Sequence, residues 1–106
     1  MMNDPTVLEA SVALADNLTG KQPGPQAAVT NAFVRIINRQ PDKQEFDILM
    51  QYYKEQEAYF KDNPETVIKV TKAGEYEMKN KPAPEIAALV RLVQVIYNMA
   101  EAITKT

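Results

Sequence analysis

The sequence predicts an all-α fold, a small bundle of four to five helices around an apolar C-terminal helix. Apolar residues recur at helical spacing in successive segments of the chain. Gly and Pro gather between these segments, where they end helices and favour turns. No segment shows a clear strand pattern, and a chain of 106 residues is one domain by size. We therefore expect residues 1–106 to form a single helical domain.

Proline and glycine delimit the first two helices. We expect the first helix to begin at Asp4 and Pro5, because the aspartate can cap free backbone N–H groups and the proline needs no N–H at the first helical position. Its apolar period stops at residues 20–25, where four of the six residues are Gly or Pro. The second helix is predicted from about 26 to 39, since Pro41 forbids its continuation.

A capping-box pattern predicts the start of the third helix. Asp42 and Glu45 stand three residues apart, so that each side chain can bond the backbone N–H of the other residue. The helix is expected to run to about Asp62. On its outer side, Glu57 and Lys61 form a favourable i, i+4 pair worth about 0.3 kcal/mol.

A short fourth helix is predicted between Asn63 and Gly74. The sequence Asn63-Pro64-Glu65 repeats the pattern of a cap followed by proline. Residues 66–71 are the most strand-like stretch because they are rich in β-branched side chains, yet the cap before them and the glycine after them favour a helix. Residues 75–84 are mostly polar and contain two prolines, so we expect an exposed loop there.

The last helix, predicted from Pro84 to about Ile103, has an unusually wide apolar surface. Its main apolar face is extended by Leu92, Val95 and Met99 most of the way round the helix. Such a helix is usually central and covered on several sides. Any part of this surface left uncovered would favour a homodimer.

The composition excludes several kinds of chemistry and partner. The chain has no Cys and no His, which leaves no disulfide framework, thiol nucleophile, imidazole base or common zinc site. The net charge is −2 and the basic residues are scattered, so we expect no nucleic-acid partner. No apolar window is long enough for membrane insertion, and the N-terminus lacks the regions of a signal peptide. Either the protein is cytoplasmic, or the chain is a piece of a longer exported protein.

Carboxylates are the remaining acid–base candidates. Asp42, Glu45 and Asp47 cluster at one helix start, where each negative charge is stabilised by about 0.3–1 kcal/mol, so a capping role accounts for them. Asp62, Asn63 and Glu65 form a second polar corner, which a helix start also explains. Neither corner has the alternating oxygen ligands around a glycine turn that a calcium loop needs. We therefore predict no catalytic residue, no metal and no cofactor, and expect the protein not to be an enzyme. An enzyme would require distant acidic residues to meet in a pocket.

Tyrosines make up five of the eight aromatic residues. Tyr53 and Tyr97 fall on apolar helix faces and are expected to fill the core with their hydroxyls at its edge. Tyr52, Tyr59 and Tyr76 are the predicted partner contacts, because a tyrosine-rich surface can bind sugars, peptides or another protein.

The last helix also carries a polar set of Arg91, Asn98 and Glu101. Asn98 lies one turn before Glu101, and Arg91 lies two turns earlier still. We predict that an ion pair of Arg91 or a backbone bond of Asn98 anchors this helix to its neighbours. A ligand site is the less favoured interpretation of the same residues.

Several short motifs follow one another along the chain, among them Asn3-Asp4-Pro5, Arg39-x-Pro41, Asn63-Pro64, Gly74-Glu75, Pro84-Glu85-x-Ala87-Ala88 and Asn98-x-x-Glu101. In this order the sequence resembles the planctomycete-specific domain of unknown function that ends planctomycete-type cytochrome c proteins. The resemblance covers nearly the whole chain. It departs from the family at Leu89, where the family often has Trp, and at Ala100, where it has an acidic residue.

The resemblance implies that this chain is the C-terminal fragment of a longer, exported and extracytoplasmic protein. The haem motif of such proteins lies elsewhere, and the resemblance supplies no catalytic residue for this region. The expected function is a non-catalytic helical packing or interaction module whose partners are the upstream domains. The alternative is a free-standing helical adaptor that binds a peptide in a groove lined by the three predicted contact tyrosines.

Overall fold

A computed structural model describes residues 5–19, 24–72 and 74–104 of the chain. Within these ranges the backbone forms five helices and no strand, so the predicted all-α fold is confirmed. The predicted cap at Asp4 and the predicted loop residues 20–23 lie outside the described residues. The helices are α1 (Pro5–Leu18), α2 (Pro25–Ile37), α3 (Lys43–Asp62), α4 (Glu65–Thr71) and α5 (Pro84–Thr104).

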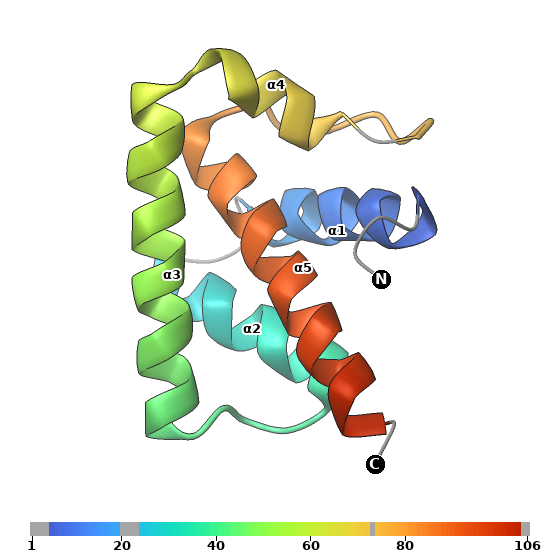
Figure 1. Ribbon diagram of the computed structural model, residues 1–106. Helices are drawn as coiled ribbons and strands as arrows, with labels where there is room; N and C mark the ends of the chain where they lie inside the picture. The colour runs from blue at the N-terminus through green and yellow to red at the C-terminus, as the bar shows by residue number, and fades with distance from the viewer. Residues whose placement is uncertain (1–4, 20–23, 73, 105–106) are drawn as a thin grey trace.

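Helix α5 lies at the centre of the fold and packs against each of the other four helices. Figure 1 shows α3 along one side of the molecule and α1 on the other, with α5 crossing between them. Full burial of an aliphatic or aromatic side chain contributes about 1.5–3 kcal/mol, so this central helix supplies much of the apolar core. The largest fully buried apolar side chains are Phe33, Phe60, Leu92, Ile96, Val12, Val29, Val90 and Val93.

The connection from α2 to α3 is fixed by local polar contacts. Asn38 ends α2 in the left-handed region with φ of 66° and donates its backbone N–H to the carbonyl oxygen of Val34 at 2.9 Å. The capping box is confirmed: Glu45 N–H donates to Asp42 Oδ1 at 2.8 Å, and Asp42 N–H donates to Glu45 Oε1 at 2.9 Å. Arg39 donates two further hydrogen bonds to the Glu45 carboxylate, both of 2.8 Å. The hydrogen bonds that the carboxylate accepts from the Arg39 side chain and, with a smaller effect, from the Asp42 backbone lower the pKa of Glu45 to about 2.

The turn between α3 and α4 differs from the prediction. Asn63 does not cap α4, because its side-chain amide donates back to the carbonyl oxygen of Tyr59 at 2.9 Å and so closes the end of α3. Pro64 takes the N-cap position of α4 without a side-chain bond. The predicted pair at the end of α3 is present, with Lys61 Nζ and Glu57 Oε2 3.9 Å apart.

The segment between α4 and α5 is a loop, as predicted, but it is exposed only in part. Helix α4 ends at Thr71, before the predicted end at Gly74. Beyond it, Tyr76, Met78 and Asn80 are half-buried. Polar side chains of α1 hold this segment in place.

Candidate functional site

A buried carboxylate on α1 is the most heavily hydrogen-bonded side chain of the described structure. Asp16 is 1% exposed and belongs to the face of α1 that packs into the fold. Its Oδ2 accepts the hydroxyl of Tyr76 at 2.7 Å and the backbone N–H of Lys79 at 2.6 Å. Its Oδ1 accepts the backbone N–H of Asn80 at 3.1 Å and the side-chain amide of Asn80 at 2.7 Å. These four bonds use the four lone-pair positions of an ionised carboxylate, so Asp16 has none left for a metal or a substrate.

The electrostatics of this anchor keep Asp16 ionised and Tyr76 protonated. Burial alone would raise the pKa of Asp16, but the hydrogen bonds from Lys79, Tyr76 and Asn80 outweigh it, and the pKa lies below its ordinary value of 3.8. The same bond stabilises the neutral phenol and, with burial, raises the pKa of Tyr76 to about 12. This geometry fixes a loop and has no group poised to exchange protons near neutral pH.

A second carboxylate of α1 fixes the beginning of the same loop. Glu9 Oε2 accepts the backbone N–H groups of Glu75 at 2.8 Å and Tyr76 at 3.2 Å. Gly74 precedes them with φ of 58°, a conformation that favours glycine. A Cβ atom at position 74 would also lie only 2.8 Å from Cδ of Glu9. Glycine is therefore favoured here by its backbone angle, and a larger residue would also displace the Glu9 carboxylate that binds the loop.

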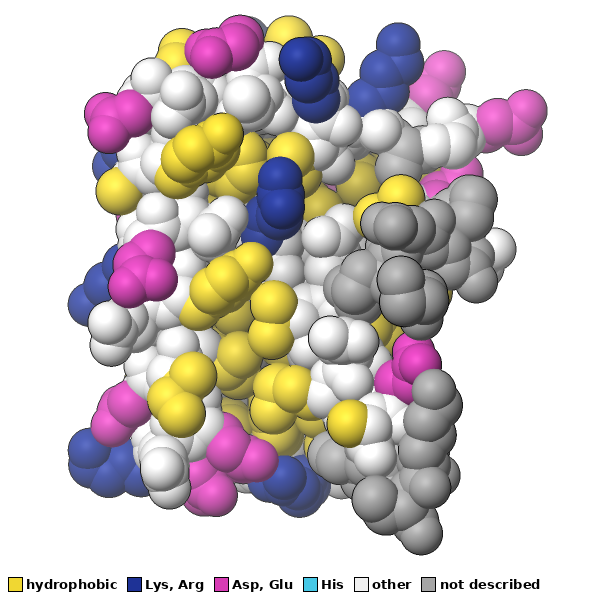
Figure 2. Space-filling model, viewed as in Figure 1, with side chains coloured by type: hydrophobic (Ala, Val, Ile, Leu, Met, Phe, Trp, Pro, Cys, Tyr) yellow, Lys and Arg dark blue, Asp and Glu magenta, His cyan; other side chains and the backbone are white. Residues whose placement is uncertain are grey.

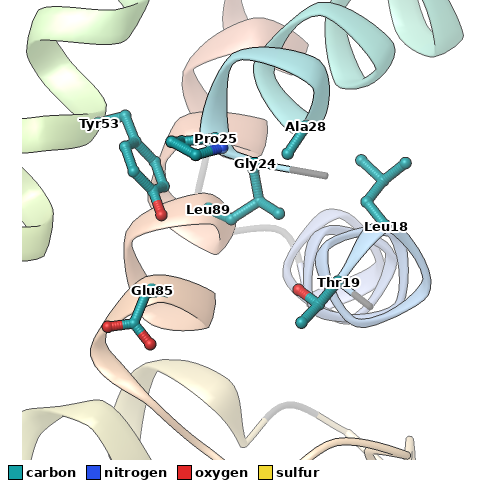
Figure 3. Close-up of a pocket in the computed structure, with 8 residues that line it drawn as sticks. All are labelled: Leu18, Thr19, Gly24, Pro25, Ala28, Tyr53, Glu85 and Leu89. Atoms are coloured by element: carbon teal, nitrogen blue, oxygen red, sulfur yellow. The ribbon is translucent and has the colours of Figure 1, made fainter. Parts of the chain in front are cut away.

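A small pocket lies near the N-terminal ends of α2 and α5 (Figure 3). It encloses about 190 Å³, which is below the usual 300–1,000 Å³ of small-molecule sites. Tyr53 is only 6% exposed, and burial, followed by the charges of Glu57 and Glu85, raises the pKa of Tyr53 to about 12. The pocket is mostly apolar, with Glu85 as its charged lining residue. It is lined by Leu18, Thr19, Gly24, Pro25, Ala28, Tyr53, Glu85 and Leu89.

An exposed apolar surface lies where α3 meets α5. Figure 2 shows hydrophobic side chains gathered in a band along this boundary, with charged side chains beside them. On α3, Ile48 is 61% exposed and Tyr59 is 47% exposed, and Tyr52 is half-buried. On α5, the guanidinium of Arg91 lies over the ring of Phe60, 5.8 Å from its centroid. We call this surface the α3–α5 face; it consists of Ile48, Tyr52, Glu55 and Tyr59 on α3 and Arg91, Val95 and Met99 on α5.

The structure brings together only some of the predicted contact and anchor residues. Tyr52 and Tyr59 share the α3–α5 face with Arg91, whose charge is close enough to Tyr52 to oppose the rise that burial causes in the pKa of that phenol. Tyr76 lies apart from them, because its hydroxyl is bound to Asp16 on α1. The three tyrosines therefore do not line one groove.

The predicted buried anchor does not hold for Arg91 or Asn98, since both residues are exposed on α5. The guanidinium of Arg91 lies over the ring of Phe60 while the residue as a whole stays exposed to solvent. Glu101 is half-buried near the end of the same helix. Of the two tyrosines expected in the core, Tyr53 is buried and Tyr97 is half-buried.

Sequence reasoning missed the carboxylates that organise the loop. Asp16 stands between the buried Ala15 and Leu18, on a helix whose other buried positions are apolar or small. A charged residue at a buried position of an apolar helix face indicates that it has a polar partner inside the fold. The tyrosine and asparagine that serve as partners lie about 60 residues further on, in a loop with no periodicity to place it.

No family model, curated protein or solved structure matches this chain. The family resemblance therefore stays a prediction. Among the described residues, no three His, Cys, Asp or Glu side chains are arranged to hold a metal ion. The described helices are too short or too polar to cross a membrane.

Proposed function

We propose that this chain is a non-catalytic helical interaction module and that the α3–α5 face is its contact surface. The observation that carries the proposal is the alignment of Ile48, Tyr52 and Tyr59 on one side of α3 beside the exposed Arg91. Single exposed apolar residues are normal in proteins, but several of them gathered on one side of a helix mark an interaction site. Tyrosine and arginine are also the side chains that most often dominate the energetics of protein interfaces.

The chemistry of the acidic residues supports a role other than catalysis. Asp16 and Glu45 have lowered pKa values because hydrogen bonds hold them in the ionised form. An efficient general acid or base needs a pKa near the working pH, so neither residue suits that task at neutral pH. Both carboxylates instead fix backbone segments, one in the loop after α4 and one at the start of α3.

The order of the sequence motifs supports a place for this module in a larger extracytoplasmic, cytochrome c-associated protein. In that setting the α3–α5 face would contact the upstream domains or another copy of the parent protein. The peptide-binding adaptor is less favoured, because Tyr76 is bound to α1 and cannot join Tyr52 and Tyr59 in one groove.

Site-specific photo-crosslinking tests the proposed contact surface. A benzophenone amino acid replaces Tyr59 on the face or, as the control, Glu77 on the exposed part of the loop after α4. The protein is irradiated in cells that express it, and adducts are identified by mass spectrometry. We expect a discrete adduct from position 59 and none from position 77. Equal labelling at both positions, or none at either, would contradict the proposal.

A further inference from the structure

The exposed stripe on α3 has a spacing that reads the same in both directions. Ile48, Tyr52, Glu55 and Tyr59 are separated by four, three and four residues, which keeps them on one side of a helix. Reversing the helix about a point between residues 53 and 54 exchanges position 48 with 59 and position 52 with 55. With this spacing, two copies of the stripe can pair about a two-fold axis so that each residue of one copy meets its counterpart on the other.

We infer that a second copy of this chain covers the α3–α5 face, with the two α3 helices packed antiparallel across a two-fold axis at residues 53–54. This inference rests on the proposed function, because it names the partner of the same surface. In this register Ile48 of each copy meets Tyr59 of the other, so two of the most exposed large apolar side chains cover one another. Their burial in the dimer would drive association.

The charges of the face match the same register. The two-fold axis sets Tyr52 of one copy opposite Glu55 of the other. Arg91 lies over the ring of Phe60 and acts electrostatically on Tyr52 within each copy, so this register sets it on the side of the contact that Glu55 of the second copy occupies. Within its own chain, Glu55 accepts one long hydrogen bond, from Nε2 of Gln51 at 3.3 Å. Two symmetric Arg91–Glu55 pairs therefore complete the contact, and each combines a cation and an anion that face solvent in the single chain.

Charge reversal tests this register in the full chain. The variants are Arg91→Glu and Glu55→Arg, each of which would place like charges opposite one another at both symmetric sites. We expect the wild-type chain to dimerise in analytical ultracentrifugation and each single variant to raise the dimer Kd at least tenfold. An equimolar mixture of the two variants pairs opposite charges at both sites, and we expect it to regain a heterodimer near the wild-type Kd. Glu77→Arg is the matched control and should leave the Kd unchanged.

A disulfide experiment tests the antiparallel direction separately. The chain has no Cys, so introduced thiols are the only ones present. Positions 48 and 59 are about 16 Å apart along one α3 helix, far beyond the reach of a disulfide, so oxidation of Ile48→Cys/Tyr59→Cys can join only two chains. We expect this double variant to form a covalent dimer at least tenfold faster than Ile48→Cys alone. Both positions are exposed, and circular dichroism verifies that each variant keeps its fold.

The outcomes separate this inference from the proposed function. A wild-type chain that stays monomeric up to about 1 mM would overturn the dimer. So would single charge variants that dimerise like wild type, a mixture that does not recover, or equal disulfide rates in the single and double variants. If position 59 then still photo-crosslinks to a different protein, the proposed function stands and only the second copy is refuted. If it crosslinks to nothing, both fail.

Discussion

The substitution Asp16→Asn tests whether the buried carboxylate of α1 is a main determinant of stability. Asparagine has nearly the same shape as aspartate but offers one carbonyl oxygen in place of two acceptor oxygens. In the native structure both oxygens are used, since Oδ2 accepts Tyr76 and Lys79, and Oδ1 accepts two donors from Asn80. Whichever way the new amide turns, its NH₂ group faces two donors.

The expected magnitude follows from counting these donors. A buried donor that loses its acceptor costs about 1–3 kcal/mol, so two of them would cost about 2–6 kcal/mol. Because these bonds are only part-buried, we expect a loss at the low end of this range. For a domain of this size, 1 kcal/mol corresponds to about 4–8 °C in Tm, so the melting temperature should fall by about 10 °C or more. The control Asp62→Asn alters an exposed carboxylate at the end of α3 and should change stability by less than about 0.5 kcal/mol.

Urea and thermal unfolding followed by circular dichroism measure both variants. The pH dependence adds a second readout. Because the pKa of Asp16 is lowered in the folded state, its ionised form contributes stability above pH 3.8 that is lost as the pH falls through the folded value. Asp16→Asn should lack this contribution at every pH. A loss of less than 0.5 kcal/mol at pH 7, equal to that of the control, would refute the view that these bonds hold the loop.

Three further predictions concern the loop, the caps and the tyrosines. Gly74→Ala should lower the free energy of unfolding by about 1–3 kcal/mol in urea titrations, because position 74 combines a positive φ with a close contact to the Glu9 side chain. The control Gly24→Ala places its Cβ at an ordinary 3.5 Å from Oε1 of Gln26 and should change stability little. Asp42→Ala removes the N-cap of α3 and should cost about 1 kcal/mol in the same assay, and an unchanged midpoint would contradict the capping role. The pKa values of Tyr53 and Tyr76 are raised to about 12, so their neutral forms contribute stability that is present below pH 10 and lost between pH 10 and 12. Ultraviolet titration should show two phenols that ionise near pH 12, and Tyr76→Phe should remove one of them.

The features that sequence alone predicted are those decided within one or two helical turns. The capping box needs only Asp42 and Glu45, whose positions in the chain bring the side chains to each other's backbone. The Glu57–Lys61 pair depends only on the spacing of four residues, which places both side chains on one side of the same helix. Apolar periodicity likewise places each helix without knowledge of its neighbours, so the all-α class follows from local pattern.

The features that sequence did not predict depend on contacts between distant segments or on a choice between local alternatives. The bond between Asp16 and Tyr76 joins positions 60 residues apart, and no local rule selects that partner among the polar residues of the chain. At Asn63 two local uses compete, a cap for α4 and a bond to the end of α3. The second is realised, because its amide donates to the carbonyl oxygen of Tyr59.

The two sides of α5 use their polar groups in different ways, and this difference separates folding from association. On the α1 side, the carboxylates of Asp16 and Glu9 accept hydrogen bonds from the loop after α4, so substitutions there should lower the free energy of unfolding. On the α3 side, Tyr59 and Arg91 are exposed to solvent. A shorter side chain at either position would not break a buried hydrogen bond. Substitutions on that side should therefore change what the protein binds while leaving its unfolding nearly unaltered. A variant of Arg91 that unfolds as easily as Asp16→Asn would show that the charge belongs to the fold and not to a partner.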